Sequence, residues 1–456
     1  MKLVYGVKDK PSFGKTLVFA LQQLLAILAA TIAVPAIIGN GMSQSAALFG
    51  AGVGTIVYLL FTKFRSPVFL GSSFAFLGSM AAAFAGGVSA SAGYLGMIIG
   101  AVMAGLVYVV IALIVKFAGV KWISKLMPAV VIGPTVAIIG LSLSGNAIGD
   151  AVGVAKDGSA FVMNAHAGVC LICALVTLAV TMLCSVFGKK MMKMIPFIIG
   201  IVSGYIVASI FTIIGNNTGI DAMKIIDYSA FSNLRWVPSF TFETAFSGGY
   251  DFGDAGSIAS YIGTIAAAYV PVAFVVFAEH IADHKNISTI IEHDLLEDPG
   301  LHRTLLGDGV GSMVGAFFGG CPNTTYGESI GCVAISGNAS VVTIFATAIL
   351  AIVASFFAPF VAFLASIPSC VMGGVCISLY GFIAVSGLKM IQDVDLGENR
   401  NLFIVSVILI AGVGGLVLKF GSVTITEVAC ALILGILTNL ILPEKKKADK
   451  DASETK

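Results

Sequence analysis

The chain has 456 residues, of which 58% are hydrophobic and 11% are charged, and its mean hydropathy is +1.01. A soluble domain of this size would expose far more charge, so the composition excludes a water-soluble protein and indicates a membrane protein. The formal net charge of +1 gives no indication of nucleic-acid binding, and we expect no nucleic-acid partner.

Apolar runs long enough to cross a bilayer recur along the whole chain. The polar start, Met1 to Ser12, precedes an apolar run that is too long for the core of a signal peptide, so we expect this run to be retained as the first span. The predicted fold class is an all-α polytopic membrane protein. We predict about fourteen transmembrane segments, near 14–36, 44–62, 70–86, 93–117, 126–145, 166–187, 195–215, 259–281, 303–319, 324–336, 339–363, 369–388, 401–418 and 423–442.

Two of these segments, the third (70–86) and the tenth (324–336), are weak as full spans. The third opens on Gly71-Ser72-Ser73 and the tenth on Asn323-Thr324-Thr325. Polar and glycine-containing interruptions are expected where unwound backbone borders a site at membrane depth. We therefore predict a short extended piece followed by a half-helix in each.

Positive charges gather in alternate loops, and this pattern indicates the orientation of the chain. The loops after even-numbered segments are basic, with Lys63, Arg65, Lys116, Lys121, Lys125, Lys189, Lys190, Lys193, Lys389 and Arg400. The other loops are nearly uncharged or, across 216–258, net acidic. Because positive charge marks the cytoplasmic side, we expect both termini inside and 216–258 outside.

Two internal echoes indicate a repeat. Pro128–Gly133 is similar to Pro368–Gly373, and Ser72–Phe74 is similar to Thr324–Tyr326, with two hydroxyl residues and an aromatic residue in each copy. Both pairs lie seven segments apart, and an odd number of spans inverts the second copy. Inverted repeats with paired broken helices are typical of alternating-access transporters. The alternative is chance similarity within a small apolar alphabet.

Two glutamates are candidates for the site. Glu328 is the only charged residue between Asp308 and Lys389, and a carboxylate among apolar segments usually faces a cavity or a pathway. A solvated loop position is the alternative for Glu328, and a helix-end position is the alternative for Glu279. Asp283 lies one helical turn beyond Glu279 on the same face, which favours a proton shared between the two carboxylates.

Most of the chain resembles the nucleobase–ascorbate transporter family, and within it the bacterial uracil permeases. The resemblance rests on these stretches: Leu21-Gln22-Gln23 through Val34-Pro35, Leu70 to Phe76, Ala278-Glu279-His280-Ile281, Asp294-Leu295-Leu296, Asp298 to Arg303, Pro322-Asn323-Thr324-Thr325-Tyr326-Gly327-Glu328, Met372-Gly373-Gly374 and Leu379-Tyr380-Gly381. It implies two inverted repeats of seven segments, arranged as two domains. The core domain comprises 1–117 and 259–366, the gate domain 118–258 and 367–443, and 444–456 is a cytoplasmic tail. The gate domain would also make the contact of a homodimer.

The resemblance also implies a site for a neutral planar base. A carboxylate accepts hydrogen bonds from ring N–H groups, backbone N–H groups donate to the carbonyls, and an aromatic wall covers the ring. The expected substrate-binding residues are Phe74, Glu279, Gly327, Glu328, Ser329 and Tyr380. Further pocket-lining residues are Gln23, Ser73, Thr325 and Tyr326. The residues expected to carry the coupling proton are Glu279, Asp283 and Asp308.

Some positions depart from the uracil members of the family. Asp283 stands where they have histidine, and both Asp283 and Asp308 resemble the purine-transporting members. Gln23 replaces a histidine, and Ser329 replaces an asparagine that could contact a substrate carbonyl. These departures leave a xanthine or uric acid permease as an alternative to a uracil permease.

The predicted function is proton-coupled uptake of uracil across the cytoplasmic membrane by alternating access. Sodium is the alternative coupling ion, and we expect no metal site and no cofactor. An anion exchanger of the same fold is a further alternative, but an anion site should carry a basic residue. An enzyme is not expected, because the five histidines lie toward segment ends and loops without an H-E-x-x-H or G-x-S-x-G motif.

Overall fold

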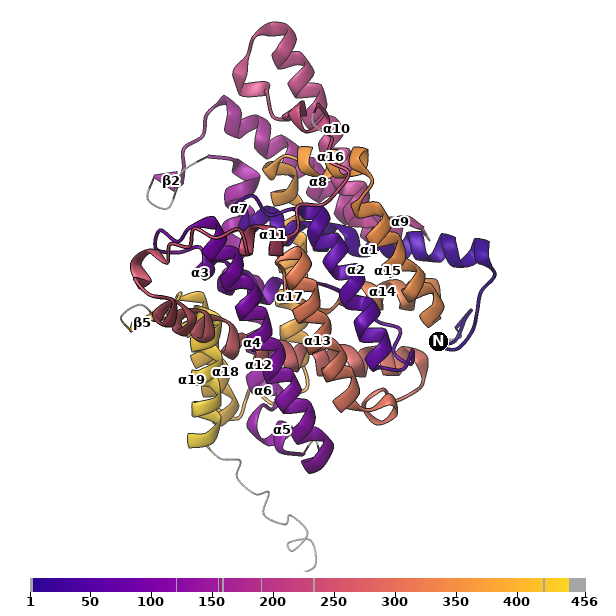
Figure 1. The fold of residues 1–456 in the computed structure, drawn as a ribbon, viewed down its shortest axis with the longest axis vertical. Helices are drawn as coiled ribbons and strands as arrows, with labels where there is room; N and C mark the ends of the chain where they lie inside the picture. Colours follow the sequence, from indigo (N-terminus) through magenta and orange to yellow (C-terminus); the bar gives the residue numbers. More distant parts are fainter. Residues whose placement is uncertain are drawn as a thin grey trace, which may run out of the picture.

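The computed structural model describes residues 3–119, 121–154, 156–157, 160–189, 191–232, 234–420 and 423–442, and the chain is mainly helical (Figure 1). The α-helices are α1 Phe13–Ile38, α2 Gln44–Phe61, α3 Leu77–Ala83, α4 Ala90–Ala118, α5 Lys121–Leu126, α6 Ala129–Ser142, α7 Ser144–Val152, α8 Ala165–Phe187, α9 Met191–Met194, α10 Pro196–Thr218, α11 Thr241–Ala245, α12 Ile258–Ile291, α13 Leu301–Gly319, α14 Gly327–Ser336, α15 Val341–Ser355, α16 Ala358–Ser366, α17 Ser369–Met390, α18 Asn399–Val413 and α19 Glu427–Ile441. The short turns are η1 Phe74–Phe76, η2 Asp221–Met223, η3 Tyr228–Phe231, η4 Gly253–Ala255 and η5 Leu296–Gly300. The strands are β1 Leu70–Ser72, β2 Lys156–Asp157, β3 Ala160–Phe161, β4 Asn323–Thr325, β5 Leu418–Phe420 and β6 Val423–Ile425.

Within the described ranges, eight helices are long and apolar enough to cross a membrane. They become nine if α15 and α16, which are bent by 82° relative to each other, form one span. The chain is therefore a multi-pass membrane protein, as its composition predicts. Each of the fourteen predicted ranges contains a helix, but several of these helices are short, and the count of fourteen spans stays a prediction.

The two weak segments meet in the middle of the fold. Strands β1 and β4 pair antiparallel, with Leu70 opposite Thr325 and Ser72 opposite Asn323. The turn η1 with α3 follows β1, and α14 follows β4, so each range contains a short strand and then a short helix. In a membrane interior the polar backbone of an isolated strand would lack partners, and the pairing supplies them.

Two sequence predictions need correction. The description as all-α omits two short hairpins, β2–β3 and β5–β6, which lie between helices. The eighth segment was predicted to end at residue 281, but α12 continues to Ile291. The polar residues after 281 lower the hydropathy, yet the helix persists because some of them are buried and hydrogen-bonded, as described below.

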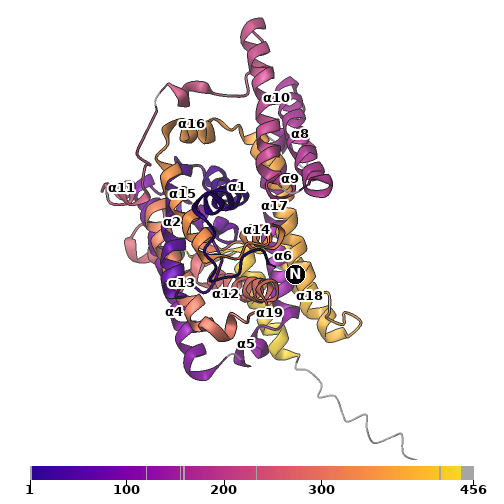
Figure 2. The same cartoon turned by 90° about the vertical axis from the view of Figure 1, so that its right-hand side faces the viewer.

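Helix packing divides the elements into two groups. Helices α2, α4, α13 and α15 pack on one another on one side of the molecule, and α6, α8, α10, α17, α18 and α19 pack on one another on the other side. Figure 2 shows the two groups side by side, with α2, α4, α13 and α15 facing α8, α10, α17 and α18. Most of the paired strands and half-helices lie between the groups.

Close packing of glycines positions strand β4. Helices α2 and α13 approach so closely that a Cβ added at Gly54 would lie 2.8 Å from the Gly311 carbonyl oxygen and 2.7 Å from Asn323 Nδ2. Small residues allow such approaches between membrane helices. The Asn323 amide fills the gap and donates a hydrogen bond to the Gly50 carbonyl at 3.0 Å. The start of β4 is thereby anchored to the α2–α13 pair.

Candidate substrate site between the broken helices

The backbone around the paired strands presents both half-helices to one small cavity. Two further hydrogen bonds extend the pairing, from the Ser73 N–H to the Pro322 carbonyl (2.9 Å) and from the Tyr326 N–H to the Phe69 carbonyl (3.2 Å). As a result, η1 begins at Phe74 and α14 begins at Gly327 next to the same space.

This central cavity has a volume of about 40 Å³. Its lining residues come from η1, α6, α12, β4, α14 and α17, and they are Ser73, Phe74, Ala75, Ile139, Glu279, Thr324, Thr325, Tyr326, Gly327, Glu328 and Ile383. The polar side chains all come from the broken segments and α12, whereas α6 and α17 contribute only Ile139 and Ile383. The cavity therefore has one polar side and one apolar wall.

Glu279 and Glu328 are the two carboxylates that line the central cavity. Both side chains are partly accessible, and neither forms an ion pair or accepts a hydrogen bond from another residue in the described ranges. Glu328 is the second residue of α14, near the positive end of the helix dipole. Two carboxylates without protein partners can accept hydrogen bonds from N–H groups of a bound molecule.

Asp283 lies behind the cavity rather than in its lining. Its Oδ2 accepts a hydrogen bond of 2.7 Å from the Thr325 hydroxyl, and Thr325 itself lines the cavity. Asp283 and Glu279 lie one turn apart on α12. A change in the protonation of Asp283 would therefore act on the site through Thr325 and through charge repulsion with Glu279.

Ser329 and Gln23 do not line the central cavity. The fully buried Ser329 hydroxyl accepts hydrogen bonds from Gln23 Nε2 (2.5 Å) and from the Phe69 N–H (3.1 Å). These bonds connect α14 with α1 and with the residue before β1. The two side chains therefore position the half-helix that carries Glu328, because their polar groups are used within the protein.

Two aromatic residues hold the edges of the site. The Tyr380 ring packs edge-on against the Phe74 ring, with centroids 5.7 Å apart, and so contacts the lining from outside. The Tyr326 hydroxyl donates to the Ser72 carbonyl at 2.7 Å, and its ring covers Gly71, where a Cβ would lie 2.3 Å from a ring carbon. Tyr326 thus fastens the two strands together.

Asp308 is buried in α13 and belongs to a different cluster from the cavity carboxylates. Its Oδ2 lies 2.7 Å from His280 Nδ1, and the other ring nitrogen of His280 lies 3.0 Å from the Thr304 hydroxyl. The ring of His284 stacks on that of His280 with centroids 4.0 Å apart, and its Nε2 lies 2.7 Å from the Tyr58 hydroxyl.

This cluster corrects the prediction that the histidines lie toward segment ends and loops. His280 and His284 are fully buried within the long helix α12. Hydropathy could not identify them as interior residues, because their partners come from α2 and α13, which are distant in sequence.

Four lining residues were missed by the sequence analysis: Ala75, Ile139, Thr324 and Ile383. Ala75 and Thr324 neighbour predicted residues, so the motif itself could have included them. Ile139 and Ile383 carry no chemical signal. Only their place in the fifth and twelfth segments, which contain the similar stretches Pro128–Gly133 and Pro368–Gly373, could have suggested them.

The described residues contain no group of three or more histidine, cysteine, aspartate or glutamate side chains that could hold a metal ion. All eight cysteines are buried. The residues that line the central cavity offer hydrogen bonding, charge and apolar contact.

Comparison with known proteins assigns the sequence to a protein family. Residues 14–419 match a model described as the permease family. The chain is 41% identical to a uracil permease of Bacillus caldolyticus, covering 99% of this chain and 98% of that protein. It is 38% identical to a uracil permease of Bacillus subtilis strain 168 (99% and 98% covered) and 34% identical to a uracil permease of Escherichia coli strain K12 (96% and 93% covered).

The same fold occurs in more distant solved structures. The transmembrane domain of the cyanobacterial bicarbonate transporter BicA superposes with a TM-score of 0.60 at 16% identity, covering 96% of this chain and 99% of that one. SLC26A9 superposes with a TM-score of 0.67 at 12% identity, covering 94% of this chain and 64% of that one. At these identities the likeness shows the fold alone.

Proposed function

This chain belongs to the permease family, and from that premise we propose that it takes up uracil across the cytoplasmic membrane. The family membership makes it a transport protein for a small molecule and not an enzyme. The observation that carries the choice of substrate is the pair of carboxylates, Glu279 and Glu328, on the polar side of one cavity, neither of which has an ion-pair partner within the described part of the chain. The uracil permeases among its relatives support the same choice.

The chemistry of the cavity matches a neutral pyrimidine base. Uracil has ring N–H donors flanked by carbonyl acceptors, and the carboxylates of Glu279 and Glu328 can accept from the donors. The backbone N–H groups at Gly327 and Ser329, in the first turn of α14, can donate to the carbonyls. Phe74, held in place by Tyr380, covers one ring face.

The small volume of the central cavity supports a mechanism with moving parts. About 40 Å³ holds only a few water molecules and lies well below the roughly 300 Å³ of typical ligand pockets. Entry of a base requires Ile139 and Ile383 to move away from the polar side. We assign the polar side to a core domain and the apolar wall to a gate domain, whose relative motion gives alternating access.

Helix packing supports the two inverted repeats. The contact of α2 with α15 has a counterpart in that of α13 with α4, and the contact of α8 with α17 has one in that of α18 with α6. Each helix and its counterpart, α2 and α13, α15 and α4, α8 and α18, and α17 and α6, lie seven predicted segments apart. The proposed boundaries remain those of the sequence, with the core in 1–117 and 259–366 and the gate in 118–258 and 367–443. The predicted tail, 444–456, lies outside the described residues.

Proton coupling is the second part of the proposal. Asp283 is linked to the lining through Thr325, and it faces Glu279 from one turn away. One proton held by these carboxylates would reduce their mutual repulsion and favour binding of a neutral base. Asp308, paired with His280 outside the cavity, is the other proposed proton carrier. Sodium is the competing coupling ion.

The orientation and assembly are proposed on the sequence pattern. The basic loops support cytoplasmic termini in the plasma membrane, and the resemblance supports a homodimer through the gate domain. A xanthine or uric acid permease is the second candidate function, which Asp283 and Asp308 favour. An anion exchanger is disfavoured, because two carboxylates line the cavity, whereas its lining among the described residues includes no basic side chain.

Uptake of radiolabelled uracil into proteoliposomes tests the proposal. An inward proton gradient should drive accumulation that unlabelled xanthine does not compete, and Glu328→Gln should abolish it in the same preparation. Accumulation that follows a sodium gradient instead would show that sodium, and not the proton, is the coupling ion. Uptake of xanthine in place of uracil would overturn the substrate, and uptake of neither base would overturn the proposed function.

A further inference from the structure

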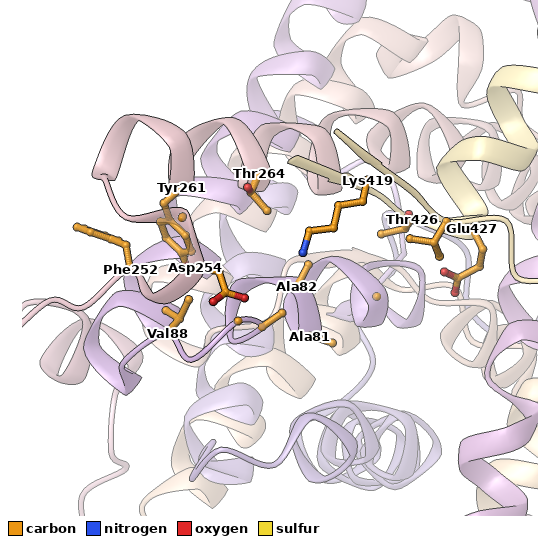
Figure 3. Close-up of a pocket in the computed structure, with 15 residues that line it drawn as sticks. Ala81, Ala82, Val88, Phe252, Asp254, Tyr261, Thr264, Lys419, Thr426 and Glu427 are labelled. Atoms are coloured by element: carbon orange, nitrogen blue, oxygen red, sulfur yellow. The ribbon is translucent and has the colours of Figure 1, made fainter. Parts of the chain in front are cut away.

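A large crevice opens between the end of α3, the start of α12 and the β5–β6 hairpin (Figure 3). Its volume of about 470 Å³ is more than ten times the 40 Å³ of the central cavity. Pockets that bind small molecules typically have volumes of roughly 300–1,000 Å³. The crevice is therefore large enough for a base, whereas the central cavity in this conformation is not.

Small residues of the third segment, Gly78, Ala81, Ala82 and Ala85, line one side of the crevice, and the rings of Phe252 and Tyr261 lie at one end (Figure 3). Small side chains leave room for a planar ring to lie against the helix, and aromatic rings can contact its edge. This lining can therefore accommodate a planar ring.

Polar groups converge on the opposite side. Figure 3 shows the Lys419 side chain extending from the hairpin toward Ala82, between Asp254 and Glu427. No ion pair engages Lys419 with any residue in the part of the chain that the structure describes. Its ammonium group is therefore available to donate to a carbonyl oxygen of a bound molecule.

Thr426 is the second group available to a ligand. Its side chain is only 7% exposed, and its hydroxyl has no hydrogen-bond partner among the described residues. The residue is the N-cap of α19, where a threonine hydroxyl commonly bonds to the helix backbone, but no such bond forms. A buried hydroxyl without a partner is costly unless a ligand or water satisfies it.

Shared lining residues link the crevice to the central cavity. An intermediate space of about 60 Å³ shares Gly78, Thr426 and Glu427 with the crevice. The same space shares Phe74, Ala75 and Ile139 with the central cavity. The three spaces thus neighbour one another in a row between the hairpin and the two central glutamates.

We propose that this crevice is an outer binding site for the base, occupied before the base reaches the central cavity, with Lys419 and Thr426 as its hydrogen-bonding residues. This inference rests on the proposed function and on the proposed orientation, which puts the loops carrying Asp254 and Lys419 outside the cell. Asp254 and Glu427 accept from the ring N–H groups, as Glu279 and Glu328 do further in. The outer site increases the capture of substrate, and binding at this site does not depend on the central carboxylates.

Cysteine protection tests the outer site separately from the central one. The eight native cysteines are buried, so Ala82→Cys should be the reactive thiol toward a membrane-impermeant maleimide added outside intact cells. Uracil should slow this labelling, and it should do so at the same uracil concentrations in Ala82→Cys combined with Glu328→Gln, in which central binding is weakened. Ser247→Cys, on the exposed external loop, is the matched control and should show no protection.

Lys419→Met and Thr426→Val, each in the Ala82→Cys and Glu328→Gln background, should raise the uracil concentration for half-protection by about fivefold, as expected for one lost hydrogen bond. Protection of Ala82→Cys that disappears with Glu328→Gln would overturn the proposal, because it would report only a shape change caused by central binding. Labelling that requires access from the cytoplasm would also overturn it. A protein that neither transports nor binds uracil would instead overturn the proposed function.

Discussion

The close approach of α2 and α13 predicts a large effect for a single methyl group. In Gly54→Ala the new Cβ would lie 2.7 Å from Asn323 Nδ2 and 2.8 Å from the Gly311 carbonyl oxygen, whereas ordinary contacts begin near 3.4 Å. Either the two helices move apart or the Asn323 amide leaves its place.

The expected cost has two parts. Overpacking of a tight interface costs about 1–3 kcal/mol, and loss of the bond from Asn323 to the Gly50 carbonyl costs about 1 kcal/mol more. The total of about 2–4 kcal/mol should lower the melting temperature of the purified protein. Because Asn323 is the first residue of β4, the shift should also reach Thr325 and the cavity, and it should lower the initial rate of uracil uptake.

The matched control is Gly331→Ala, at an interior position of α14 where an added Cβ has no atom within 4 Å among the described residues outside the adjoining backbone of its own helix. This substitution should keep or raise stability by up to about 1 kcal/mol, since alanine is the better helix former. Thermal unfolding in detergent and uptake into proteoliposomes, measured on both variants, test whether the glycine crossing positions β4. If Gly54→Ala melts and transports like Gly331→Ala, the glycine crossing does not position β4.

Three further predictions concern the site itself. Glu328→Gln should leave the melting temperature nearly unchanged, because the carboxylate has no partner elsewhere in the described protein. The same substitution should weaken uracil binding by about tenfold to a hundredfold. Unchanged affinity in equilibrium binding would contradict the role assigned to Glu328. Ser329→Ala removes the acceptor of two buried N–H groups and should destabilise the protein by about 1–3 kcal/mol. Weaker binding without a change in melting would show that the Ser329 hydroxyl faces the substrate after all. Thr325→Val breaks the bond to Asp283 and should alter the dependence of uptake on external pH while uracil still binds, and an unchanged pH profile would exclude this link.

The sequence predicted membrane class and family, and it located the two broken segments, because these depend on local composition and on motifs. The same reasoning stopped α12 ten residues short. Hydropathy treats His284 as a polar residue at a boundary, whereas the fold buries it against Tyr58 of α2. Which polar residues are interior depends on partners that local sequence does not contain.

Local sequence also does not predict which way a side chain points at the start of a half-helix. Ser329 follows Glu328 directly, and the motif suggested that both meet the substrate. The helix turns Ser329 toward Gln23 and the Phe69 N–H, so that one residue lines the cavity and the next supports it. The apolar wall was missed for a different reason, because isoleucines such as Ile383 cannot be told from lipid-facing ones by their chemistry.

The pairing of β1 with β4 has a consequence for how the two halves of the chain fold in the membrane. Each strand leaves unpaired backbone groups that hydrocarbon cannot satisfy, and the strand that satisfies them belongs to the opposite half of the polypeptide. Neither half is therefore complete at membrane depth alone, and the two halves behave as obligate partners joined by the stretch 219–257. Co-expression of the chain as two fragments cut in that stretch should yield a reassembled protein, whereas either fragment by itself should be degraded.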